Sequence, residues 1–209
     1  MDWTQLPLGP LQTNCYVLSH ESTCILFDPG SEGEQLVQWL NENKLKPIAI
    51  LLTHAHFDHI GAIGALKQKF DIPVYLHKEE EQWLEDPALN GSARFGMGTI
   101  KAPPADVILD QEKELTVGPF KLQLLYTPGH SPGSLSYYFE EGGALFAGDT
   151  LFMGSIGRTD LPGGNHQILI DSIHEKIMSL PEETIVLPGH GPATSIIAEM
   201  DSNPFLNGF

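Results

Sequence analysis

Three histidines and an aspartate fall within six residues of this chain, in the sequence HAHFDH at positions 54–59. They directly follow a short aliphatic run whose length and composition predict a buried strand. Residues two apart point to the same side of an extended segment, so His54 and His56 can bind one metal ion together. Asp58 and His59, at the predicted turn into the next helix, can face a second ion. Zinc, iron and manganese all accept imidazole and carboxylate ligands, so we expect the fold to present a metal site here.

Three further candidate ligands share one placement, because each lies just past a predicted strand and beside glycine. They are His130 in TPGHSPG, Asp149 in FAGDT and His190 in LPGHG. Glycine beside a ligand lets the backbone turn sharply and approach an ion closely. The sequence therefore predicts a site assembled from seven side chains. The remaining histidines match no ligand position, and we expect surface or structural roles for them: His20, His77, His166 and His174.

Hydrophobic periodicity predicts alternating strands and helices along the chain. The predicted helices are 34–42, 60–70, 168–177 and one or two turns within 194–200. The predicted strands are 16–18, 24–27, 48–52, 74–76, 114–117, 121–126, 135–139, 144–147 and 184–187. The glycine- and proline-rich stretch 85–104 reads as a long irregular segment, functional or mobile. No linker divides the 209 residues, which are 41% hydrophobic, so we predict one domain, 1–209, with helices outside two sheets.

Composition narrows the classes of partner and the compartment. The net charge is −16 with only two arginines, so electrostatic repulsion disfavours nucleic acid and anionic membranes as partners, and no protein partner is indicated. The longest aliphatic run is too short to cross a bilayer, and the N-terminus lacks a signal-peptide pattern. Cys15 and Cys24 cannot form a disulfide scaffold and are expected to be buried thiols on one hairpin. These features predict a cytoplasmic location.

The order of the candidate ligands resembles that of the metallo-β-lactamase superfamily. The resemblance covers essentially the whole chain and includes the early sequence FDPG at positions 27–30. It implies an α/β (α+β) fold, the αββα sandwich, in which two mixed sheets are flanked by helices and the site lies at one edge. It also implies a role for Asp28, which would orient the histidine segment. The same residue could instead be a simple turn-former before Pro29.

The resemblance further implies how the ligands divide between two metal ions. His54, His56 and His130 would bind the first ion. Asp58, His59 and His190 would bind the second ion, and Asp149 would bridge both. Zinc is the expected metal, with iron and manganese as alternatives, since all three accept histidine and carboxylate ligands.

Within the superfamily, the chain is most similar to short, single-domain glyoxalase II-like proteins, which are hydroxyacylglutathione hydrolase-like. The stretches that carry this likeness are GDTLF at 148–152, GRTD at 157–160 and NPFL at 203–206. The likeness places Arg158 near the thiol part of a substrate, although Arg158 and Asp160 could equally form a structural ion pair. Full-length glyoxalase II has a C-terminal helical extension with basic residues that help hold glutathione. No such extension follows His190 here, which leaves the thiol carrier open.

The expected reaction is metal-dependent hydrolysis of a small-molecule thioester such as S-lactoylglutathione. Metal coordination lowers the pKa of water to about 7, so a hydroxide bridging the ions at Asp149, with Asp58 as a further catalytic ligand, would attack the carbonyl carbon. A thiol with a pKa of about 8.5 leaves as thiolate without a general acid. Three alternatives stay open: a lactonase or β-lactamase, a mononuclear iron persulfide dioxygenase, and a non-enzymatic protein with structural metals.

Overall fold

The computed structural model describes residues 1–95 and 98–206, and its contacts divide the chain into two compact units. Unit 1 comprises Met1–Asp110 and Val117–Pro119, and unit 2 comprises Gln111–Thr116 and Phe120–Phe209. Each unit contains a six-stranded sheet and its own helices. The one-domain assignment made from the sequence stays a prediction.

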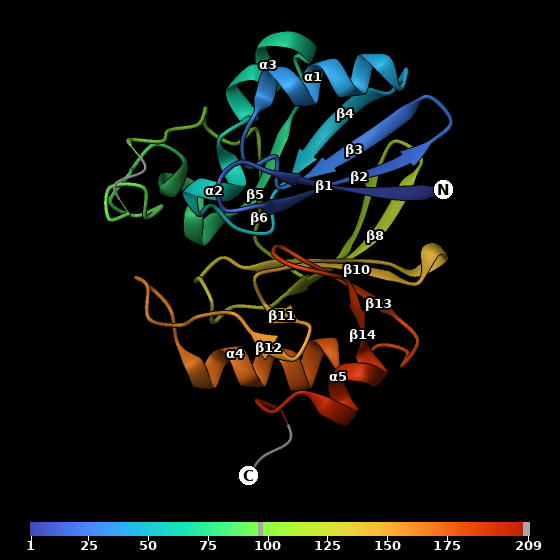
Figure 1. Ribbon diagram of the computed structural model, residues 1–209, viewed down its shortest axis with the longest axis vertical. Coiled ribbons are helices and arrows are strands. Elements are labelled where there is room, and N and C mark those ends of the chain that lie inside the picture. The colour runs from blue at the N-terminus through green and yellow to red at the C-terminus, as the bar shows by residue number, and fades with distance from the viewer. Residues whose placement is uncertain (96–97, 207–209) are drawn as a thin grey trace. The chain divides into compact units, whose positions relative to one another are not determined.

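The sheet of unit 1 is mixed, with the order β1-β2-β3-β4-β5-β6. Strands β1 to β3 pair antiparallel and β3 to β6 pair parallel. Helices α1 and α3 lie side by side on one face of this sheet (Figure 1). The strands are β1 (Asp2–Leu8), β2 (Thr13–His20), β3 (Thr23–Phe27), β4 (Lys46–Leu51), β5 (Val74–His77) and β6 (Val107–Leu109). The helices are α1 (Gly33–Glu42), α2 (Phe57–Ile60), α3 (Ile63–Phe70) and the 3₁₀-helix η1 (Lys78–Leu84).

The parallel arrangement of β3, β4 and β5 decides where the site of unit 1 forms. Their carboxyl ends share one edge of the sheet, as carboxyl ends of parallel strands do. The chain leaves β3 at Asp28, leaves β4 into the segment 53–59 and leaves β5 into η1. Residues far apart in the sequence therefore meet at this edge.

The sheet of unit 2 has the order β14-β13-β10-β9-β8-β7. Strands β10 and β13 pair parallel, whereas β8 and β10 each pair antiparallel with β9. Strands β8, β10 and β13 therefore run the same way, so the loops that carry His130, Asp149 and His190 leave one edge. The strands are β7 (Glu114–Val117), β8 (Phe120–Tyr126), β9 (Leu135–Phe139), β10 (Ala144–Gly148), β13 (Ile185–Pro188) and β14 (Thr194–Ser195).

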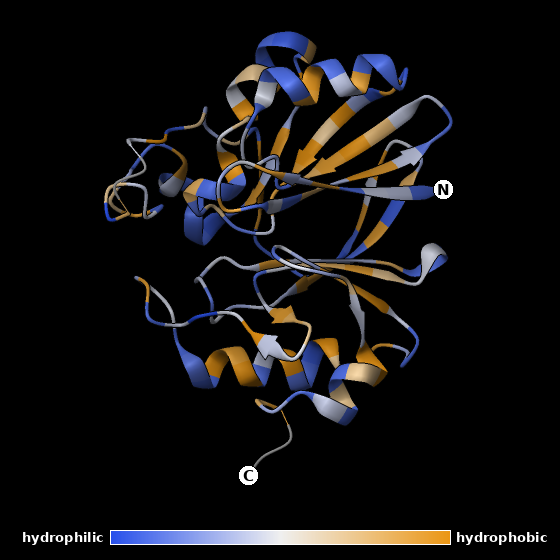
Figure 2. Ribbon diagram, viewed as in Figure 1, coloured by the Kyte–Doolittle hydropathy of each residue, from blue (hydrophilic) through white to orange (hydrophobic). Residues whose placement is uncertain are grey.

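Helices and a small hairpin complete unit 2 (Figure 1). Helix α4 (His166–Ser172) continues as a π-helical turn (Ile173–Ile177), and α5 (Ile196–Ser202) follows β14. The hairpin joins β11 (Leu151–Phe152) to β12 (Ser155–Ile156). Buried residues of α4, α5, the hairpin and the sheet form one apolar cluster. In Figure 2, helices α1 and α4 alternate between polar and apolar residues, as expected for helices with one buried face.

The predicted fold class, two mixed sheets flanked by helices, is confirmed. One predicted helix, 60–70, is wrong in its bounds, because the structure has α2 and α3 separated at Gly61 and Ala62. The amides of these two residues donate to the carbonyl oxygens of Gly30 and Pro29 instead of continuing a helical ladder. The helix predicted within 194–200 begins at Ile196, since Thr194 and Ser195 pair with β13. Strands β1, β6, β11 and β12 were not predicted.

Other sequence expectations concern thiols, membranes and the long loop. Cys15 and Cys24 are buried free thiols on the hairpin of β2 and β3, and burial raises the pKa of Cys24 to about 12. Within the described part of the chain, no helix is long and apolar enough to span a bilayer. The described residues of 85–104 form no helix or strand, as predicted, and Gly96 lies outside them.

Candidate metal centre

The segment that carries the first four candidate ligands is held in extended form by alternate backbone amides. Each amide donates to a different part of unit 1. The amides of Thr53, Ala55 and Phe57 donate in turn to Asp28 Oδ1 (2.8 Å), Glu80 Oε2 (2.6 Å) and the Asn90 carbonyl oxygen (3.0 Å). Side chains alternate along an extended segment, so the side chains of His54 and His56 lie on one side of it and that of Ala55 lies on the other. Their ring centroids lie 4.8 Å apart.

Asp28 fixes the tautomer of His54 through the hydroxyl of Thr53. The Thr53 hydroxyl donates to Asp28 Oδ2 at 2.6 Å, so its oxygen serves as acceptor for His54 Nδ1 at 3.0 Å. With the proton on Nδ1, a neutral imidazole carries its lone pair on Nε2. His54 is buried, and its Nε2 atom is thereby prepared to bind a cation.

His59 is oriented by the same carboxylate. Its Nδ1 atom lies 3.0 Å from Asp28 Oδ2, and its side chain is fully buried. Because a carboxylate accepts, His59 also carries its proton on Nδ1 and its lone pair on Nε2. This Nε2 atom lies 3.5 Å from Asp58 Oδ2. Thr13 on β2 donates its hydroxyl proton to the same Asp58 oxygen at 2.8 Å, which fixes the carboxylate.

Close backbone packing explains the glycine of the early FDPG sequence. Asp28 has a positive φ of 48°, an uncommon conformation for a residue with a side chain. A Cβ atom on Gly30 would lie 1.7 Å from the Asp58 carbonyl oxygen. The turn after β3 therefore presses directly on the helix that carries Asp58, and only glycine fits there.

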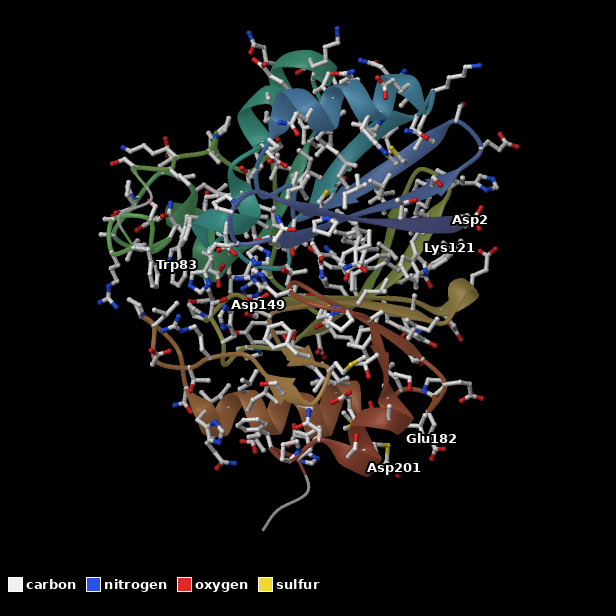
Figure 3. The ribbon with its side chains drawn as sticks, viewed as in Figure 1. Asp2, Trp83, Lys121, Asp149, Glu182 and Asp201 are labelled. Atoms are coloured by element: carbon white, nitrogen blue, oxygen red, sulfur yellow. The ribbon has the colours of Figure 1, made fainter. Side chains whose placement is uncertain are left out.

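Unit 2 brings its three candidate ligands together around one carboxylate. Asp149 Oδ2 lies 3.7 Å from His130 Nε2 and 3.6 Å from His190 Nε2. Asp149, labelled in Figure 3, follows β10 directly. His130 Nδ1 lies 2.8 Å from the backbone oxygen of Arg158, which can only accept, so the lone pair of His130 is on Nε2.

The loop after Asp149 folds back over its own ligands. A Cβ atom on Gly157 would lie 1.9 Å from the Asp149 carbonyl oxygen and 3.2 Å from His130 Cβ. The ring of Phe152 meets that of His190 edge-on, with centroids 6.4 Å apart. Phe152 and Gly157 thus place the hairpin of β11 and β12 in contact with all three ligands.

The donor set of each unit fits a divalent cation. In both units, a histidine Nε2 lone pair faces a carboxylate oxygen at 3.5–3.7 Å, beyond the usual hydrogen-bond range. Two acceptors that face each other repel unless a cation lies between them. Two ligands that each bind zinc at about 2.0–2.1 Å with tetrahedral angles are about 3.4 Å apart, close to these separations.

The profile of the metallo-beta-lactamase superfamily matches residues 8–190 of the chain. The chain belongs to this superfamily. It is 54% identical to the probable metallo-hydrolase YqgX of Bacillus subtilis, covering all of this chain and 99% of that protein. It is 39% identical to the hydroxyacylglutathione hydrolase GloC of Haemophilus influenzae, covering 97% of this chain and 96% of that protein. The chain is accordingly a metal-dependent hydrolase.

Two solved structures of the superfamily are close in fold. The BLEG-1 B3 metallo-beta-lactamase has a TM-score of 0.97 and 57% identity, covering 99% of this chain and all of that one. TTHA1623 in a di-iron-bound form has a TM-score of 0.87 and 43% identity, covering 97% of this chain and all of that one. Both similarities extend over essentially the whole chain.

The structure groups the predicted site residues by unit. Unit 1 gathers Asp28 with the segment that carries His54, His56, Asp58 and His59, and unit 2 gathers His130, Asp149 and His190. Asp28 makes the contacts expected of an orienting residue. Arg158 contributes its backbone oxygen to the centre, a contact that was not predicted.

The Arg158 side chain forms the ion pair that the sequence left as one alternative. Its guanidinium makes two hydrogen bonds to the carboxylate of Asp160, at 2.7 and 2.8 Å, and both side chains are largely exposed. The bond to Arg158 lowers the pKa of Asp160 to about 2. A substrate-binding role for Arg158 stays a prediction.

Sequence reasoning missed three residues that hold the histidine segment. Glu80 is a fully buried carboxylate, and Asn90 is a fully buried amide that also bonds the carbonyl oxygens of Trp83 and Ile100. The ring of Trp83, labelled in Figure 3, lies 5.5 Å from that of His56. Nothing in the sequence distinguishes Glu80 from the neighbouring Glu79 and Glu81, because its burial depends on the fold.

Proposed function

We propose that this hydrolase cleaves small-molecule acyl-thioesters such as S-lactoylglutathione, using a pair of divalent ions. His54, His56 and His130 would hold one ion. Asp58, His59 and His190 would hold the other, and Asp149 would touch both. Zinc is the expected metal, and iron is an alternative supported by the di-iron form of TTHA1623.

The chain's own residues prepare the site for this chemistry. Asp28 keeps the lone pairs of His54 and His59 on Nε2, and the Arg158 backbone oxygen does the same for His130. Thr13 holds the carboxylate of Asp58 in place, so that few side-chain torsions need to be fixed on binding. When bound, divalent ions supply Lewis acidity and acidify water to a pKa of about 7.

The observation that carries the proposal is the acceptor role of the carboxylates around the ligands. Asp28, Asp58 and Glu80 each accept a hydrogen bond from a hydroxyl or an amide, and Asp149 faces two histidine nitrogens. We therefore assign none of Asp28, Asp58 and Glu80, which are engaged as acceptors, as the acid that an amine leaving group would need. A thiolate, with a conjugate pKa of about 8.5, needs none. The similarity to GloC along the whole chain supports the same substrate class.

Hydrolysis of β-lactams is a second candidate. The 57% identity to the BLEG-1 B3 metallo-beta-lactamase supports it. The same lone-pair geometry would serve a strained cyclic amide, whose opening releases ring strain.

The experiment is a substrate panel on metal-loaded protein. It compares S-lactoylglutathione, the lactoyl thioester of a small neutral thiol, a chromogenic β-lactam and an aliphatic lactone. We expect kcat/KM for both thioesters to exceed that for the lactam and lactone by at least about tenfold, which is 1.4 kcal/mol of transition-state binding. The Asp149→Ala variant controls for contaminating hydrolases. A higher kcat/KM for the β-lactam would overturn the proposal in favour of the second candidate.

A further inference from the structure

A buried carboxylate outside the predicted ligand set lies on the C-terminal helix of unit 2. Glu199 in α5 is 1% exposed and accepts three hydrogen bonds. The donors are the Gly154 amide (2.9 Å) and the Asn203 side-chain amide (2.8 Å) to Oε2, and the Thr194 hydroxyl (2.6 Å) to Oε1. Burying a carboxylate is costly unless donors satisfy it, so this cluster of donors is a built feature of the fold.

Two of these donors belong to segments that carry candidate metal ligands. Gly154 is in the turn of the β11–β12 hairpin, which directly follows Asp149. Thr194 begins β14, which directly follows the His190 loop. Glu199 therefore ties the segment after Asp149 to the segment after His190 with a single side chain.

The hairpin transmits this restraint to the ligands. From its first strand, Phe152 packs against the ring of His190. After its second strand, Gly157 packs on Asp149 and the Arg158 backbone oxygen accepts from His130. A shift of the hairpin turn would move all three contacts.

The NPFL sequence at 203–206 connects Glu199 to the second strand of the hairpin, β12. Asn203 is fully buried, and its side-chain amide donates to both Glu199 and the Ser155 carbonyl oxygen, the latter at 3.1 Å. Its side-chain oxygen accepts from the Phe205 amide at 2.9 Å, and Leu206 packs on the apolar cluster of unit 2. This sequence thus locks the C-terminal segment onto the hairpin.

We infer that Glu199 is a positioning residue, which sets the geometry of His130, Asp149 and His190 for metal binding without contacting the ion. The inference rests on the proposed metal centre but not on the identity of the substrate. Partners that orient metal ligands typically change affinity by about 10–100-fold when removed. We expect Glu199→Ala to weaken metal binding by a factor in this range.

The test measures metal affinity of the folded protein by competition with a chromogenic zinc chelator. Unfolding temperatures with and without metal are measured in parallel. Glu199→Ala should bind zinc about 10–100-fold more weakly and should lose part of the stabilisation that metal confers. Glu199→Gln should stay close to wild type, because its oxygen can accept from Gly154 and Asn203 while its amide donates to the Thr194 hydroxyl.

Two further variants separate positioning from general weakening of α5. Ser195→Ala removes the N-cap bond from the Ala198 amide and destabilises the same helix, but it leaves the Glu199 contacts intact. It should lower the unfolding temperature without changing zinc affinity. If Glu199→Ala fails to fold, Thr194→Val removes only the bond to the segment after His190 and should still weaken zinc binding.

Each other outcome has a definite meaning. Unchanged zinc affinity in both Glu199→Ala and Thr194→Val overturns the inference, as does an equal loss in Ser195→Ala. If wild-type protein binds zinc but does not hydrolyse thioesters, the proposed substrate class fails while the role of Glu199 stands. If wild-type protein binds neither zinc nor iron, both fail.

Discussion

The two units of this hydrolase hold their candidate metal ligands in different ways. In unit 1, four candidate ligands lie on one continuous segment, and hydrogen bonds to its alternate amides hold that segment. In unit 2, three candidate ligands come from three separate loops, and close glycine packing and a clamped hairpin hold them. Unit 1 therefore carries its candidate ligands in one short segment that distant residues hold in place, whereas unit 2 gathers its ligands through strand order and through residues near the end of the described chain.

The two units should respond differently to substitution of a ligand. When a ligand on the continuous segment of unit 1 is replaced, the backbone hydrogen bonds still hold the neighbouring ligands in place. Asp149 faces both His130 and His190, so its removal should disturb the whole ligand set of unit 2.

The largest expected effect tests this difference directly. Asp149→Ala should lower kcat/KM by more than about 100-fold and should leave less than one tightly bound metal ion per chain, because both ions would lose a ligand. His56→Ala should lower activity comparably but retain about one ion. Metal content by mass spectrometry after desalting checks this. Equal metal loss in the two variants would break the comparison.

Asp28→Asn should have the next largest effect and should lower kcat/KM by about 10–100-fold. An asparagine amide facing Thr53 and His59 would donate where the carboxylate accepts, which would shift the proton of His59 onto Nε2. We expect kcat/KM, measured by steady-state kinetics, and zinc affinity to fall together. Asp106→Asn is the matched control in unit 1, because Asp106 accepts from the Val74 amide away from the ligands. A similar loss in the control would count against a role in orienting histidines.

Glycine substitutions sharpen the comparison at the level of the backbone. Gly30→Ala and Gly157→Ala would each place a Cβ within 2 Å of the carbonyl oxygen of an aspartate ligand. We expect each to cost at least about 1–3 kcal/mol of stability by overpacking and to reduce metal affinity. Gly64→Ala in α3 is the control, since a Cβ there meets no atom within 4 Å. Denaturant unfolding should show it as neutral or stabilising, by up to about 1 kcal/mol.

The smallest effect concerns the exposed ion pair of Arg158 and Asp160. The hydrogen bond from Arg158 lowers the pKa of the Asp160 carboxyl to about 2. The pair therefore stabilises the folded state at pH values above the ordinary carboxyl pKa, and this stabilisation is lost as the pH falls through about 2. Asp160→Asn should therefore change the unfolding temperature at pH 7 by no more than about 2 °C. Freed from its partner, Arg158 should lower KM for S-lactoylglutathione about twofold to threefold but leave the neutral thioester unchanged. An unchanged KM for both would argue against a substrate role of Arg158.

Much of unit 1 could be predicted from the sequence because its signals are local. The strand before His54 and the extended alternation of His54 and His56 lie within one short window, although Asp58 and His59, expected at the turn into a helix, lie inside α2. The break between α2 and α3 could not be predicted, because the carbonyl oxygens of Pro29 and Gly30 that cause it are distant in the sequence.

The residues that position the ligands of unit 2 were harder to predict, because their partners are also distant in the sequence. His130, Asp149 and His190 each stood beside glycine, so they could be identified as candidates. The short strands β11 and β12 gave no periodic signal over two residues each, and Glu199 lies on an ordinary amphipathic helix. Its role depends on Gly154 and Thr194, which only the folded chain brings to it.

The most direct measurement is a crystal structure of the metal-loaded protein, with the ions located by anomalous scattering. We predict two ions, each about 2.0–2.2 Å from its ligand atoms. His54, His56 and His130 would hold one ion, Asp58, His59 and His190 the other, and Asp149 would touch both. A single ion, or a pair of ions that leaves Asp149 uncoordinated, would contradict this prediction.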